Sequence, residues 1–191
     1  MTRMQVNIPA GVSGDFEIAH YTNQTTDREW QIYLGMKNEA HANYCVLIKD
    51  NCQMPIMQDS EGEYREHQWL WDNAVGDVFI GGLGIGMVNE FLINAPNINS
   101  VTIIENSQDV IDLVWPYCAK DSRFTLIKAD IETWTPPANS NWNVMWFDTW
   151  CGDNILSWNG YKNAMINKYS QYCNEINFWG SLSNPNGISL K

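Results

Sequence analysis

Apolar residues are spaced differently in the two parts of this chain. Over the first 60 residues they stand at alternate positions in short runs, the pattern of strands that bury one face. After residue 77 they form short continuous runs between helical stretches, the pattern of parallel strands buried on both faces. The alternating runs are residues 15–21, 30–35 and 44–48. The continuous runs are residues 78–80, 101–105, 124–128 and 144–148, with 175–179 as a candidate fifth strand.

Turn and capping residues mark the ends of several elements. The pair Asp50-Asn51 precedes a further strand-like run at 53–57, which predicts a hairpin with residues 44–48. Pro55 has no N–H and predicts that the second strand of this hairpin lies at a sheet edge. Ser60 and Glu63 form a capping box before a helix predicted over residues 64–73. Further helices are predicted over residues 87–92, 107–114 with Ser107 as N-cap, and from about 155 or 161 to 173.

These patterns predict an α/β protein. We expect a Rossmann-like, mostly parallel sheet with helices on both faces, preceded by a small N-terminal β-hairpin region. The expected division is a β-rich extension over residues 1–60 and a Rossmann-like, nucleoside-binding domain over residues 61–191. A chain of 191 residues can build one sizeable core.

Net charge and composition limit the kinds of partner that we expect this protein to bind. The net charge of −11 repels nucleic-acid phosphates and anionic lipid heads, so we expect no nucleic acid and no membrane partner. The sequence has no apolar run of the ~18 residues that span a bilayer and no signal peptide, which predicts a cytoplasmic protein. Five cysteines without C-x-x-C spacing and three scattered histidines predict no metal site. The ten tryptophans and other aromatics favour a homodimer that covers apolar surface.

A glycine-rich loop follows the run at 78–80 and precedes a predicted helix. Gly82, Gly84 and Gly86 tolerate the positive φ of a tight turn, and without a Cβ they let a ligand approach. Glu105 ends the next predicted strand, where a carboxylate can accept both hydroxyls of a ribose. The sequence therefore predicts a nucleoside site here; the alternative is a glycine-rich turn that holds no ligand.

The spacing within the loop favours one class of nucleoside. The dinucleotide fingerprint G-x-G-x-x-G would need a glycine at Met87, whereas this loop is G-x-G-x-G. No Gly-Lys-Ser/Thr follows, so the loop is not a P-loop. Both observations favour S-adenosylmethionine over NAD or a nucleoside triphosphate.

Residues 77–113 resemble class I S-adenosylmethionine-dependent methyltransferases, most closely the spermidine synthase-like branch. Residues 46–51 and 63–70 are similar to the hairpin and first helix of aminopropyltransferases, and the likeness to short methyltransferase-like proteins of bacteria and phages covers roughly residues 44–150. The resemblance implies S-adenosylmethionine or its decarboxylated form as cofactor. It also implies a chain that is C-terminally truncated relative to the full family fold.

The resemblance assigns cofactor-binding roles to particular residues. Glu105 would bind the ribose hydroxyls, and Asp130 and Ile131 the adenine amino group and ring; the alternative for Asp130 is a helix N-cap. His67 would lie near the sulfonium or the substrate entrance; its alternative is an ordinary histidine on a helix surface or at an interface. Gln58 lies within one residue of a cofactor-contacting glutamine. The glycines that would cradle the cofactor are Gly81, Gly82, Gly84 and Gly86.

Asp148 is the candidate catalytic residue. It ends the fourth continuous run, where open α/β sheets hold ligands, and by the resemblance it faces the reacting centre. A carboxylate there could orient or deprotonate an amine or stabilise a sulfonium charge. The alternative is a solvated aspartate at a strand end. Trp150 and Asp153 would line the same mouth.

Three positions depart from the families. Gly84 replaces an acidic residue of aminopropyltransferases, Cys151 replaces their second carboxylate, and Ile80 replaces the acidic residue of methyltransferases before the loop. Three hypotheses remain: methyl transfer to a small molecule, aminopropyl transfer or another reaction on an S-adenosyl nucleoside, and a non-catalytic nucleoside-binding or assembly module.

Overall fold

A computed structural model of the chain describes residues 4–22, 43–50, 52, 55–149, 155–180 and 187–190, and all structural statements concern these residues. The predicted strand at 30–35 lies outside them, as do Trp150, Cys151 and Asp153.

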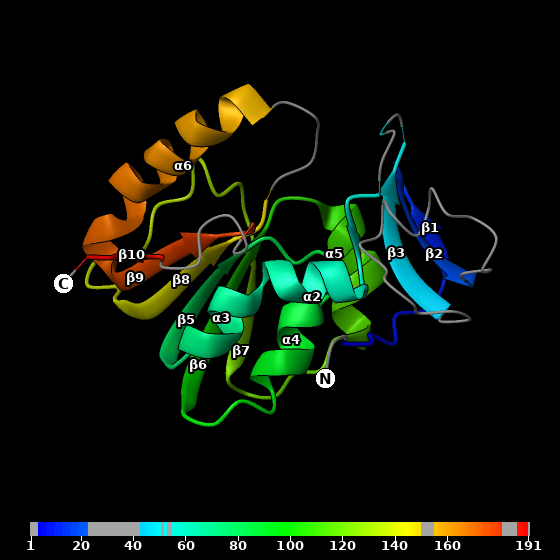
Figure 1. The fold of residues 1–191 in the computed structure, drawn as a ribbon, viewed down its shortest axis with the longest axis horizontal. Coiled ribbons are helices and arrows are strands. Elements are labelled where there is room, and N and C mark those ends of the chain that lie inside the picture. Colours follow the sequence, from blue (N-terminus) through cyan, green and yellow to red (C-terminus); the bar gives the residue numbers. More distant parts are fainter. Residues whose placement is uncertain are drawn as a thin grey trace.

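A six-stranded sheet forms the centre of the molecule (Figure 1). The spatial order is β10-β9-β8-β5-β6-β7; five neighbouring strands run parallel, and β10 pairs antiparallel with β9 at one end. This confirms the predicted mostly parallel, Rossmann-like sheet, including the candidate fifth strand. The strands are β5 (Gly76–Gly81), β6 (Ile98–Glu105), β7 (Phe124–Lys128), β8 (Trp142–Phe147), β9 (Cys173–Phe178) and β10 (Ile188–Ser189).

The chain order reverses between β5 and β8. From β5 the sheet grows through β6 and β7 in one direction, and from β8 through β9 in the other. Gly81 at the end of β5 pairs with Phe147 at the end of β8, and Asp148 N donates to Gly81 O over 2.8 Å. The glycine loop and Asp148 therefore meet at the switch point, where open α/β sheets bind ligands.

Helices cover both faces of the sheet, as predicted (Figure 1). Val78 and Ile80 of β5 belong to a core cluster with side chains of α3 (Gln68–Asn73), α4 (Met87–Leu92) and α5 (Gln108–Val114). Phe79 points to the other face, where its cluster includes Met165 and Tyr169 of α6 (Ile155–Tyr169). None of the helices in the described part of the chain is both long and apolar enough to cross a bilayer.

The N-terminal segment forms a separate antiparallel sheet in the order β1-β2-β3-β4. Its strands are β1 (Gly11–Ser13), β2 (Phe16–Thr22), β3 (Asn43–Lys49) and β4 (Met57–Gln58). The predicted hairpin is the β3–β4 pair, and β4 lies at the sheet edge as Pro55 indicated; the strand begins after this proline. Ser13 Oγ donates to Asp109 Oδ1 of α5 over 2.7 Å. The sheet therefore lies against α5, beside the carboxyl end of the central sheet.

The helix predicted over residues 64–73 is divided at His67. It consists of α2 (Glu61–Glu66) and α3, because His67, with φ −92° and ψ 3°, interrupts the regular helix. Ser60 caps α2 as predicted, its side chain accepting from Glu63 N over 3.2 Å. The carboxylate of Glu63, which a capping box would return to Ser60, is instead bound by Trp179 Nε1 at 2.6 Å. A tertiary contact thus replaces half of the predicted box.

Candidate functional site

The glycine loop has the conformation that its sequence predicted. Gly82, Gly84 and Gly86 have φ values of 99°, 52° and 71°. A Cβ on Gly82 would lie 2.1 Å from the Asp148 carbonyl oxygen, and one on Gly84 would lie 2.1 Å from Met57 Sδ. These glycines are therefore required by the backbone turn and by close contacts with the protein's own atoms.

Glu105 fastens this loop to the end of β6. Its Oε2 accepts from Leu83 N over 3.0 Å, its Oε1 accepts from Ser107 N over 2.8 Å, and the residue is only 9% exposed. A carboxylate oxygen can accept a second hydrogen bond, so the group can also serve a ribose hydroxyl. No local pattern indicated the contact with the loop. Because of this contact, Glu105 is a structural residue as well as a candidate ligand.

A cavity of about 150 Å³ opens beside the loop. It lies where the carboxyl ends of the parallel strands face the N-terminal sheet. Five residues proposed from the sequence line it, namely Gly82, Gly84, Glu105, Ile131 and Asp148. Five other proposed residues that the structure describes, Gly81, Gly86, Asp130, His67 and Gln58, are not among its lining residues.

Gly81 and Gly86 hold the elements next to the cavity in place. Gly81 O accepts from Asp148 N and so fixes the end of β8 against β5. Gly86 is the N-cap of α4, and a Cβ there would lie 2.4 Å from Cys118 Sγ. Their expected contact with the cofactor stays a prediction. In the structure, Gly81 joins β5 to the end of β8, and Gly86 lets α4 begin close to Cys118.

Asp130 and Ile131 have different surroundings in the structure. Asp130 is exposed, and its Oδ1 accepts from Glu132 N over 2.8 Å, so it caps a turn much as its alternative interpretation proposed. Ile131 is buried against the cavity, and its carbonyl accepts from Tyr169 Oη over 2.7 Å. Ile131 can therefore form a wall for a base, and an adenine contact by Asp130 stays a prediction.

The two residues of β4, Met57 and Gln58, differ in their relation to the cavity. Met57 lines the cavity, and its Sδ accepts from Ile85 N of the glycine loop at 3.4 Å. Gln58 is the next residue of β4, and successive side chains of a strand point to opposite faces. Met57 is therefore a cavity residue, and the expected cofactor contact of Gln58 stays a prediction.

The N-terminal sheet supplies cavity residues that the sequence analysis missed. Phe16, Leu47 and Lys49 all line the cavity, and Lys49 Nζ lies 5.2 Å from the centre of the Phe16 ring. Alternation along the strands indicated a buried face but not what that face would meet. The contact is a tertiary one, and no local signal marks it.

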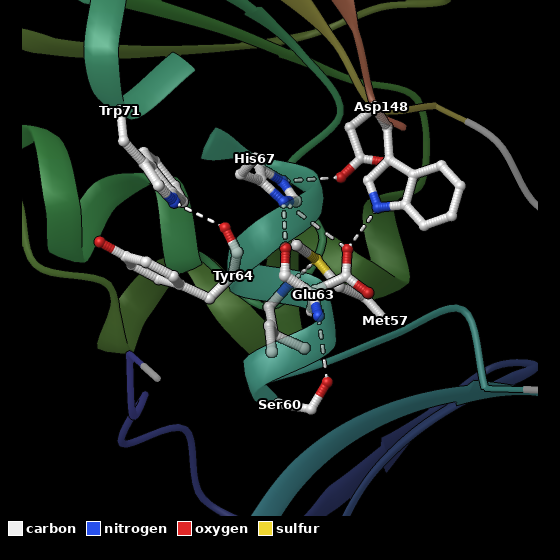
Figure 2. A network of polar contacts seen from close by, with 9 residues as sticks. Met57, Ser60, Glu63, Tyr64, His67, Trp71 and Asp148 are labelled. Carbon is white, nitrogen blue, oxygen red and sulfur yellow. Dashed lines mark hydrogen bonds and ion pairs between the residues drawn. The ribbon is translucent and has the colours of Figure 1, made fainter. Parts of the chain in front are cut away.

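His67 lies in the interior, not on a helix surface (Figure 2). The side chain is 0% exposed, and its Nε2 is 3.1 Å from Asp148 Oδ2. Its Nδ1 is 2.9 Å from the backbone oxygen of Glu63 and 3.7 Å from Glu63 Oε1. The surface interpretation of His67 is therefore wrong: the break between α2 and α3 turns the imidazole inward, behind the cavity-lining Asp148.

Burial and charge in this network shift the pKa values of Glu63 and His67. Burial raises the pKa of Glu63 to about 7; the charge of His67 lowers it, and that of Asp148 raises it further. For His67, burial opposes the charged form, but the hydrogen bond and charge of Asp148, together with Glu63, raise its pKa above the ordinary value. The charge states of Glu63 and His67 therefore depend on each other.

The same three side chains have the spacing of possible metal ligands. One donor atom from each of Glu63, His67 and Asp148 lies within 4.8 Å of the others, and a divalent cation can accept such a donor set. No sequence pattern indicates this grouping, because the three residues come from α2, the break after it and the end of β8.

Comparison with known proteins yields structural likeness only. No protein-family model matches the chain, and no curated protein matches its sequence. It is similar to the N-methyltransferase NodS from Bradyrhizobium japonicum WM9, with 14% identity and a TM-score of 0.45 over 61% of this chain and 66% of NodS. It is also similar to the spermidine synthase from Thermotoga maritima, with 14% identity and a TM-score of 0.47 over 90% of this chain and 54% of that one.

A third similar structure is the putative RNA methyltransferase PH1948 from Pyrococcus horikoshii, with 12% identity and a TM-score of 0.45. The aligned part covers 82% of this chain and 72% of PH1948. The chain spans less than two thirds of NodS and about half of the spermidine synthase. At such identities and TM-scores a likeness does not carry over an activity.

Proposed function

We propose that the cavity binds an S-adenosyl nucleoside and that the protein transfers a methyl group from it to a small-molecule acceptor. The observation that carries the proposal is the meeting of Glu105 and Asp148 in one cavity at the switch point of the sheet, with Gly82 and Gly84 between them. A net charge of −11 supports a small acceptor rather than a nucleic acid.

The donor set of the cavity fits such a nucleoside. The carboxylate of Glu105 has lone pairs left for ribose hydroxyls. Ile131 and Ala129 offer an apolar wall for a purine. Asp148 supplies a negative charge suited to a sulfonium or to an amine.

When bound, S-adenosylmethionine would supply a carbon on a positively charged sulfur, which keeps the electron pair of the broken C–S bond while the acceptor's lone pair forms the new bond. An amine acceptor must also lose a proton. Asp148 would accept the amine's hydrogen bond, align its lone pair and take that proton before releasing it to solvent. Holding the acceptor in line supplies the rest of the rate enhancement.

Titration calorimetry with S-adenosylmethionine, its decarboxylated form and S-adenosylhomocysteine tests the proposal. We expect the first and third to bind and the variant Glu105→Gln to bind them more weakly, while the exposed Asp112→Asn on α5 binds normally. Preference for the decarboxylated form would indicate aminopropyl transfer instead. Binding without turnover on any acceptor would favour a non-catalytic module, and no binding at all would refute the nucleoside site.

A further inference from the structure

Both ring nitrogens of His67 face oxygen atoms. Nδ1 lies 2.9 Å from the backbone oxygen of Glu63, and Nε2 lies 3.1 Å from Asp148 Oδ2. A backbone carbonyl oxygen and an ionised carboxylate can only accept hydrogen bonds. A neutral imidazole carries one N–H and would point a lone pair at one of these oxygens. The doubly protonated ring can donate from Nδ1 to the Glu63 oxygen and form an ion pair with Asp148 at Nε2, an atom that makes no well-aligned hydrogen bond.

Two indole rings also pack against the His67 ring. The ring stacks on Trp71 with centroids 5.2 Å apart and an interplanar angle of 14°, and it packs on Trp146 at 5.2 Å and 39°. The faces of indole rings carry negative potential and attract cations. The environment therefore favours a positive charge on the imidazole from its edges and from its faces.

A buried charge is costly unless it is paired. His67 is 0% exposed, and Asp148 and Glu63 are the titratable groups that act on it, while Glu66 acts on Glu63. Trp179, from the end of β9, donates its indole N–H to Glu63 Oε1 and fixes that carboxylate. The carboxylate of Asp148 pairs with the imidazolium, and Glu63 adds a second negative charge once it ionises.

We propose that His67 is held as an imidazolium, a buried cation that positions Asp148 from behind the cavity. One carboxylate oxygen of Asp148 is committed to His67, and the other serves the acceptor. His67 is thus a positioning residue that touches no substrate. The charge state of His67 does not depend on the reaction, but its effect on turnover rests on the proposed function.

Nitrogen NMR of protein labelled with ¹⁵N-histidine tests the charge state directly. We expect one histidine with both ring nitrogens protonated at pH 7.5, and this signal should be absent in His67→Gln. In Asp148→Asn, which keeps the shape and removes the charge, the same histidine should become singly protonated at that pH. His20→Gln, which removes a histidine of the N-terminal sheet, should leave the signal unchanged.

Two results would overturn the proposal. One is a His67 that is singly protonated in the wild type at pH 7.5. The other is one equivalent of a divalent metal in the purified protein together with an unprotonated His67 Nε2, which would make the cluster a metal site. Because Asp148→Asn keeps His67 in place, failure of His67→Gln to fold does not remove the test.

A kinetic experiment examines the positioning role. In His67→Gln we expect kcat to fall by at least ~10-fold while the Kd for S-adenosylmethionine changes little, and the acidic limb of the pH–rate profile to move to higher pH. An unchanged profile would contradict positioning through Asp148. An NMR signal as expected with no transfer to any acceptor would refute the proposed function and leave the charge state standing.

Discussion

Asp148 combines a place in the cavity with a contact to a buried histidine. It ends β8, lines the cavity and meets His67 Nε2 at 3.1 Å. We predict that Asp148→Asn keeps nucleoside affinity within a few-fold and lowers turnover by at least ~100-fold, because the amide cannot take up the acceptor's proton. Calorimetry and steady-state kinetics measure the two quantities. Loss of nucleoside binding would make Asp148 a binding residue, and full turnover would leave positioning as the mechanism.

Glu105 is expected to affect both binding and stability. Glu105→Ala removes the acceptor of two backbone N–H groups and of the proposed ribose hydroxyls. Nucleoside binding should weaken by roughly 1–3 kcal/mol, and the free energy of unfolding should fall by a similar amount, since hydrogen bonds to a charged group have this magnitude. Calorimetry and urea denaturation measure the two effects. A folded variant with unchanged affinity would remove Glu105 from the site.

At the scale of elements, two glycines of the loop between β5 and α4 should differ in their tolerance of a side chain. A Cβ on Gly82 would meet the backbone oxygen of Asp148, which cannot move without displacing β8. A Cβ on Gly84 would meet the sulfur of Met57, the end of a flexible side chain.

Gly82→Ala should therefore destabilise the protein more than Gly84→Ala does. The cost for Gly84 is set mainly by its φ of 52° and is about 1–2 kcal/mol, the penalty of a left-handed conformation with a Cβ. For Gly82 the clash with backbone is added. Urea denaturation measures the free energy of unfolding of both variants. Equal losses would mean that the backbone at the end of β8 is displaced as easily as the side chain of Met57.

At the scale of the whole molecule, the Glu63 network ties α2 to β9 and makes stability depend on pH. The pKa of Glu63, raised by burial to about 7, means that the folded protein holds a proton that the unfolded chain releases at lower pH. The stabilisation from this proton is complete below the unfolded pKa of 4.5 and is lost as pH rises through about 7. His67, with its raised pKa, contributes in the same direction at higher pH.

We predict that the free energy of unfolding of the wild type, relative to Glu63→Gln, declines between pH 5 and pH 8. The glutamine keeps the shape and cannot titrate. Urea denaturation at several pH values measures the difference, with Glu61→Gln in the same helix as control. A difference that stays constant with pH would show that Glu63 is ionised throughout.

Self-association into a homodimer is also a property of the whole molecule. Trp69, Trp71 and Trp146 are buried in one core cluster, so much of the aromatic content that favoured a homodimer is used inside the fold. Among the residues that the structure describes, the exposed large apolar ones are Val12, Tyr21, Val75 and Tyr117. The homodimer stays a prediction, which light scattering at high protein concentration checks; a monomer there would refute it.

The sequence by itself determined the features that depend on neighbouring residues. Continuous apolar runs marked the parallel strands, Ser60 and Ser107 marked helix starts, and three glycines marked a left-handed turn. These follow from backbone geometry and the alternation of side chains, which act over a few residues. Because parallel strands end at one edge of the sheet, Asp148 and the glycine loop could also be placed together from the sequence.

Only the tertiary structure decided what surrounds these elements. Glu63 and Trp179 are 116 residues apart in the sequence, and no local pattern predicts their contact. His67 became a buried ring because the helix divides there, and Met57 reached the loop because the N-terminal sheet lies beside it. Such contacts depend on how whole elements pack, and the free energy that selects the packing is summed over many distant residues.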